Sequence, residues 1–199
     1  MTIDLDDLLN SIIKSVERID CIKVDDIPNI ELYMDQVTTL IDKKLKSTTR
    51  NPGDDKILTK TMINNYTKND LLPPPDKKKY SREHVLLLVF IYYFKNMLSI
   101  NDIETLLEPL KGKYFHTEDQ ALEKIYTEIF SMEREQVKIL QEDVIERFER
   151  AKQTFVDSDF EDKETLQLFS FLCMLCFDVY VKKLLMEKII DGISESEKK

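Results

Sequence analysis

Hydrophobic residues recur three or four positions apart along most of this chain, which predicts a protein made of amphipathic helices. The pattern predicts helices near residues 3–19, 34–46, 60–68, 82–94, 100–110 and 163–190. Between residues 118 and 155 the spacing fits one long helix with a stutter, or two helices that break at residues 133–136. Glycine and proline are absent between Lys113 and Asp191, which favours long helices there. We therefore expect an all-α fold that ends in a long-helix region.

Hydroxyl residues mark the predicted starts of three helices. Thr59, Ser81 and Ser99 each precede a helical pattern, and Ser99 with Asp102 resembles a capping box. Residues 71–79, LLPPPDKKK, cannot continue a helix, because consecutive prolines lack amide donors and favour an extended path. The helix after Ser81 is apolar on all sides over residues 85–94, which is typical of a helix buried at the centre of its domain.

Charge is distributed unevenly along the chain. The formal net charge is −9, which argues against a general polyanion binder. Residues 43–84, however, contain eleven Lys and Arg against five Asp and Glu, a local charge of +6 that leaves −15 for the remainder. Such asymmetry indicates one surface suited to a polyanion and another that repels it.

The basic stretch contains the candidate binding residues. A short helix at residues 60–68 would expose polar side chains that hydrogen-bond base edges or phosphates, and the prolyl loop that follows would present a cluster of cations to a phosphate backbone. The candidate DNA-binding residues are Lys60, Thr61, Asn64, Asn65 and Lys68 on the helix, and Lys77, Lys78, Lys79, Tyr80 and Arg82 after the prolines.

The same stretch contains the runs MINNYTKN, LLPPP, YSREH and LSI-x-DI, through which it resembles a bacterial family named domain of unknown function 1836. A second set of residues in it comprises Ile63, Tyr66, Leu71, Leu72, Pro73, Pro74, Tyr80, Leu98, Ser99, Ile100 and Ile103. Through these residues it resembles, less closely and over roughly residues 34–110, the DNA-binding half of MerR-type winged helix-turn-helix regulators. Several of these residues are core or turn residues, so the resemblance implies a fold more directly than a function.

The chain departs from the MerR pattern at three places. The arginine and first tyrosine of the MerR recognition helix appear here as Asn64 and Asn65, and the turn glycine appears as Asp70. The wing is short, since only four residues, DKKK, lie between Pro75 and Tyr80. Lysine in place of arginine replaces bidentate phosphate contacts with point-charge contacts.

The resemblance implies a double-stranded DNA-binding transcriptional regulator with a MerR-like module, a short wing and a C-terminal long-helix region. The alternative is a helical protein-interaction module that kept the fold and lost DNA. We expect an N-terminal helix in residues 1–28, the winged module in 29–115, and a helical region in 116–199 that serves dimerisation or an effector. A homodimer through residues 122–155 or the last helix is expected, with an unidentified effector or protein as a further partner.

Other residue patterns indicate no catalytic, metal or cofactor site. The sequence has no glycine-rich phosphate loop, nucleophile elbow or zincin motif, so we expect no enzyme and no cofactor. Cys173 and Cys176 stand in an apolar helix, which favours buried free thiols over a metal site. His84 is expected to be exposed. The longest stretch without a charge, residues 166–177, is too short to span a membrane, and three cysteines do not make a disulfide scaffold, so we expect a cytoplasmic protein.

Overall fold

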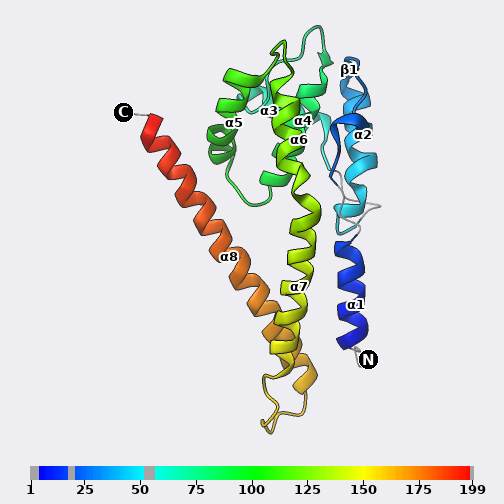
Figure 1. Cartoon of the computed structure of the whole chain (residues 1–199), viewed down its shortest axis with the longest axis vertical. Coiled ribbons are helices and arrows are strands. Elements are labelled where there is room, and N and C mark those ends of the chain that lie inside the picture. The colour runs from blue at the N-terminus through cyan, green and yellow to red at the C-terminus, as the bar shows by residue number, and fades with distance from the viewer. Residues whose placement is uncertain (1–4, 18–20, 52–56, 198–199) are drawn as a thin grey trace. The chain divides into compact units, whose positions relative to one another are not determined.

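The computed structural model describes residues 5–17, 21–51 and 57–197. The two ends of the helix expected near residues 3–19, Ile3 and Ile19, lie outside these residues. So does the dipeptide Pro52-Gly53, whose sequence predicts a turn. The fold is helical with one small antiparallel sheet, as expected (Figure 1). The helices are α1 (Leu5–Val16), α2 (Met34–Leu45), α3 (Lys60–Lys68), α4 (Arg82–Phe94), α5 (Ile100–Tyr114), α6 (Ala121–Ser131), α7 (Glu133–Lys152) and α8 (Lys163–Glu197). The strands are β1 (Leu32–Tyr33) and β2 (Lys79–Tyr80), and short 3-10 turns occupy Val24–Asp26 and Lys46–Thr48.

The predicted helix starts are confirmed. Thr59 accepts a hydrogen bond from the Met62 amide at 3.1 Å, and Ser99 accepts one from the Asp102 amide at 3.2 Å. Ser81 caps α4. Between residues 118 and 155 the two-helix interpretation is correct, because α6 ends at Ser131 and α7 begins at Glu133.

The chain divides into two compact units. The first unit comprises residues 1–20 and 132–185, and the second comprises residues 21–131 and 186–199. In the first unit α1 packs on α7, and a small core forms between α7 and α8 around Val144, Phe148, Ala151 and Phe171. The rings of Phe148 and Phe171 meet edge to face with centroids 5.2 Å apart. Partly buried side chains of α1 and α8 pack against this core.

The second unit is built around α4. Its residues from Glu83 to Tyr92 are all buried, which confirms that the all-apolar helix is the centre of its domain. The surrounding core takes side chains from α2, α3, α5, α6 and the end of α8, where Ile190 is buried. This unit spans the segment assigned to the winged module and also includes α6.

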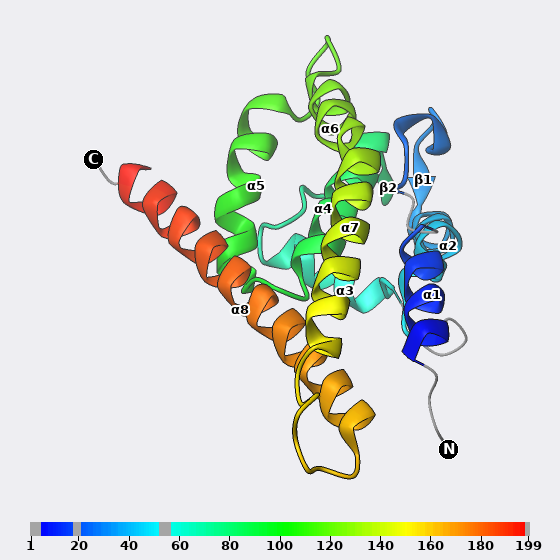
Figure 2. The same ribbon diagram turned by 60° about the horizontal axis from the view of Figure 1, so that its bottom comes forward.

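A two-stranded ladder connects the start of α2 to the basic loop, residues 73–79. β1 and β2 pair antiparallel, with Leu32 opposite Tyr80 and Tyr33 opposite Lys79 (Figure 2). Leu32 and Tyr80 are buried, so this pair anchors the sheet in the core while Tyr33 faces solvent. Because β1 leads directly into α2, the ladder fixes the basic loop beside the first turn of that helix.

Candidate nucleic-acid interface

Helix α3 is held at both ends. At its start Thr59 caps the helix, and in its middle Ile63 is fully buried. At its end the carbonyl of Tyr66 accepts the amides of Leu71 and Leu72 at 2.9 and 3.3 Å. Both leucines are buried, so the turn after α3 is anchored in the core. A nine-residue helix with anchored ends presents its outer side chains in a defined orientation.

The outer face of α3 carries the predicted polar side chains. Thr61, Asn64, Asn65 and Lys68 are all exposed, as is Lys60 at the first position. Amides, a hydroxyl and ammonium groups together form the donor and acceptor set that reads base edges and phosphates. Asp70, two residues after α3, has a φ of 54°, so this position adopts the left-handed conformation that glycine favours.

The segment between the prolines and β2 is a tight turn, here named the basic turn (residues 76–79). The amide of Lys79 donates to the carbonyl of Asp76 at 2.8 Å, and Lys77 and Lys78 have φ values of 46° and 67°. Positive φ at both central positions defines a type I′ turn, for which Asn-Gly is the favoured sequence. Two lysines therefore occupy the tip of this turn at a conformational cost.

The candidate cations differ in how they are paired. Lys60 forms an ion pair with Asp35 at the start of α2, and the ammonium of Lys79 lies 3.5 Å from the Glu31 carboxylate. Lys68, Lys77 and Lys78 are exposed and form no ion pair with any residue that the structure describes. The basic turn and the end of α3 thus present three cations that remain uncompensated.

Two of the predicted contact residues, Arg82 and Tyr80, make contacts within the protein. The guanidinium of Arg82 donates to the Glu123 carboxylate at 3.1 Å and to the Ile27 carbonyl at 3.0 Å, which joins the start of α4 to α6 and to the chain before β1. Its side chain is 17% exposed. Tyr80 is buried opposite Leu32 and supports the ladder.

The expectation that His84 is exposed is wrong. Its ring is almost fully buried beneath the prolyl loop and packs edge to face against Tyr80 and Phe115, with centroids 5.5 and 4.9 Å apart. The Ser81 amide donates to Nδ1 at 3.0 Å, so His84 takes the place that Glu or Gln holds in a capping box. Burial lowers the pKa of His84 to about 4, and repulsion from His116 adds to this, while the carbonyls of Pro74 and Pro73 oppose it. The ring is therefore neutral near neutral pH.

A cleft of about 390 Å³ with mostly polar residues in its walls lies at the start of α4, and no sequence pattern predicted it. Its walls come from the segment before β1, the first residues of α4 and residues 116–123. Glu83 is buried in one wall, where its carboxylate accepts the His116 amide at 2.9 Å and lies 2.7 Å from the His116 ring nitrogen Nδ1. These side chains come from three separate segments, so no local motif predicts them.

The two cysteines of α8 are exposed, which corrects the prediction of buried thiols. Cys173 and Cys176 lie on the side of α8 away from Phe171, the residue that enters the small core. Among the residues that the structure describes, no three His, Cys, Asp or Glu side chains are grouped as a metal site requires. In the same part of the chain, no helix has the length and apolar content to cross a membrane.

Comparison with known proteins finds one relationship. No curated protein and no solved structure matches the chain. The model of a family described as a domain of unknown function (DUF1836) matches residues 22–129, a segment that contains the β1–β2 ladder, α3 and the basic turn. That match spans more than half of the chain, and the chain therefore belongs to the DUF1836 family.

Proposed function

We propose that this protein binds double-stranded DNA through α3 and the basic turn, and that it acts as a transcriptional regulator rather than as an enzyme. The observation that carries the proposal is the tip of the basic turn. Lys77 and Lys78 are exposed and have no ion-pair partner among the described residues, and both adopt positive φ where Asn-Gly is favoured. Lysines at two strained backbone positions suggest that their positive charges bind an anionic ligand.

The order of elements supports the same function. A strand, two helices and a second strand that pairs with the first strand is the arrangement of a winged helix-turn-helix, in which the second helix enters the major groove. In this proposal Thr61, Asn64 and Asn65 meet base edges, and Lys68, Lys77 and Lys78 meet phosphates. Lys60 and Lys79 add to these contacts by exchanging Asp35 and Glu31 for phosphate.

The resemblance to MerR-type regulators supports DNA binding, but the connection between α2 and α3 differs from the usual one. The basic turn occupies the place of the MerR wing, and Asp70 adopts positive φ where the MerR pattern has glycine. The connection between α2 and α3 runs over residues 46–59, however, whereas a helix-turn-helix usually has three or four residues there. We therefore propose a winged module in which the first helix is separated from the recognition helix by an insertion.

Salt-dependent DNA binding tests this function. We expect the purified protein to retard fragments of its source genome at low salt, with affinity falling steeply as salt rises. Lys77→Glu combined with Lys78→Glu removes two phosphate contacts. The salt slope, which is the slope of log affinity against log salt concentration, should therefore fall in magnitude by about 2, and the affinity should fall by about 10- to 100-fold. The measurement is fluorescence anisotropy of a bound fragment across a salt series.

A matched control separates the site from net charge. Lys113→Glu with Lys138→Glu changes the net charge by the same amount on exposed positions outside the proposed surface. This variant should keep most of the affinity and the salt slope. Equal losses in both double variants, or no retarded fragment at low salt, would reject the proposed site.

A protein-interaction module is the second candidate. Two of the five candidate lysines already face carboxylates of this chain, in the Lys60–Asp35 and Lys79–Glu31 pairs. A shallow, largely apolar groove of about 430 Å³ also runs along α2, with Pro28, Leu32 and Leu40 in its walls. Protein partners captured by the wild-type chain, with no bound DNA, would favour this function.

A further inference from the structure

The outward side of α8 is an uncharged apolar surface. Between residues 165 and 181 the only charged residue is Asp178, which turns toward α7 and contacts Arg147 at 3.3 Å and Lys182 at 2.7 Å. Phe171 enters the core of the first unit, whereas five large apolar side chains of residues 165–181, on other sides of the helix, are 50–67% exposed. They are Phe169, Leu172, Phe177, Val179 and Tyr180.

These side chains form one stripe with the two thiols. On a helix of 3.6 residues per turn, Phe169, Leu172, Cys173, Cys176 and Tyr180 project from the same side. The exposed side chains of Phe177 and Val179 form the two edges of this surface. We name this surface the α8 stripe. It leaves on the order of 600 Å² of apolar side-chain surface exposed, which is the upper end of the largest apolar patch on a typical soluble monomer, and patches of that size often mark an interaction site.

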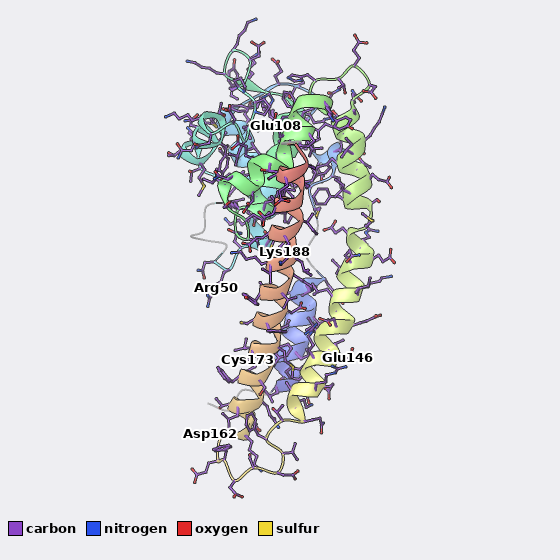
Figure 3. All side chains as sticks on the ribbon, turned by 90° about the vertical axis from the view of Figure 1, so that its left-hand side faces the viewer. Arg50, Glu108, Glu146, Asp162, Cys173 and Lys188 are labelled. Atoms are coloured by element: carbon purple, nitrogen blue, oxygen red, sulfur yellow. The ribbon has the colours of Figure 1, made fainter. Side chains whose placement is uncertain are left out.

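The two ends of the stripe carry opposite charge. Residues 157–164, before and at the start of α8, hold five acidic side chains and one lysine, and residues 182–188 hold three lysines and one glutamate. Figure 3 shows Asp162, Cys173 and Lys188 in this order along the helix. A second copy of the stripe laid antiparallel places the acidic end of one helix beside the basic end of the other, whereas a parallel copy places like charges together.

We propose that the α8 stripe is a self-association surface that joins two copies of this chain in antiparallel orientation about Cys173 and Cys176. Two stripes bury about 1,200 Å² in total, which is the lower end of the range for specific interfaces. The apolar centre supplies the association free energy and the charged ends fix the direction, as in antiparallel helix pairs. The proposal uses no residue of the DNA-binding surface and stands independently of it.

Light scattering coupled to size exclusion tests the association. The wild-type protein should elute with a mass of about 47 kDa, twice the 23.5 kDa of the chain. Phe177→Asp, which places a carboxylate among the apolar side chains, should elute as a monomer with unchanged helical circular dichroism. The control Ile30→Asp changes a similarly exposed apolar side chain in the second unit and should leave the dimer intact.

Cross-linking tests the orientation. Thr165 and Lys183 are both exposed and lie eighteen residues apart, which is five helical turns, so they project from the same side of α8. In a background with Cys173→Ser and Cys176→Ser, Thr165→Cys mixed with Lys183→Cys should give mainly a mixed disulfide on mild oxidation. Each variant oxidised separately should give little.

The outcomes are distinct. A wild-type monomer at micromolar concentration overturns self-association. A dimer that Phe177→Asp leaves intact overturns the assignment to this stripe. Disulfides within each single variant, with no mixed disulfide when the two variants are combined, overturn the antiparallel orientation.

Discussion

At the scale of single residues, His84 couples the folding of the second unit to pH. The pKa of the buried ring is about 4, against about 6.5 for an unfolded histidine. Above pH 6.5 both states are neutral and the stabilisation is fully present. Between about pH 6.5 and 4 the unfolded chain binds a proton that the folded chain does not, so the free energy of unfolding falls by about 1.4 kcal/mol per pH unit.

We therefore expect this residue to remove about 3 kcal/mol of stability by pH 4. His84→Gln should abolish that part of the pH dependence, because glutamine keeps the capping box with Ser81 and does not titrate. Urea unfolding of both proteins at neutral and mildly acidic pH measures the difference. Parallel pH profiles in the two proteins would contradict the role given to His84.

At the scale of one element, the basic turn combines unfavourable geometry with its charge. Replacing Lys77 with Asn and Lys78 with Gly gives the sequence that a type I′ turn favours, so the free energy of unfolding should rise by about 1 kcal/mol or more. DNA affinity should fall, because two cations are lost. Thermal unfolding and anisotropy on the same preparation measure both effects.

The double substitution of Lys77 and Lys78 by Gln separates the effect of charge from the effect of backbone strain. It removes the charges and retains the strained side chains, so DNA affinity should fall without a gain in stability. An Asn-Gly variant that is no more stable than the wild type would show that the turn relieves its strain elsewhere.

Elements whose determinants are local in sequence were predicted well. Thr59, Ser81 and Ser99 form their caps with residues three positions away, and the periodicity of residues 60–68 correctly separated buried Ile63 from exposed Asn64 and Asn65. The pairing of β1 with β2 was not predicted from the sequence, because β1 lies far from the basic turn along the chain.

Side chains whose partners lie far along the chain were predicted poorly. Arg82 donates a hydrogen bond to Glu123, forty-one residues later, and His84 is covered in part by Phe115, so the contacts of neither residue could be predicted from its own neighbours in the sequence. Cys173 and Cys176 were misassigned for a different reason. A helix that is apolar on most sides does not indicate which side is buried, and here the core uses Phe171.

At the scale of the whole molecule, the two proposed surfaces make a joint prediction about the DNA site. A dimer formed through the α8 stripe carries two copies of α3 and of the basic turn, and a closed pair of identical chains has two-fold symmetry. The bound DNA should therefore contain two inverted half-sites and take up two chains. Phe177→Asp should weaken binding to the full site, because each monomer then binds without its partner, and should leave the affinity for an isolated half-site unchanged. Anisotropy titrations of the full site and the half-site measure this. A direct repeat, or an equal loss on both fragments, would show that DNA binding does not use the α8 dimer.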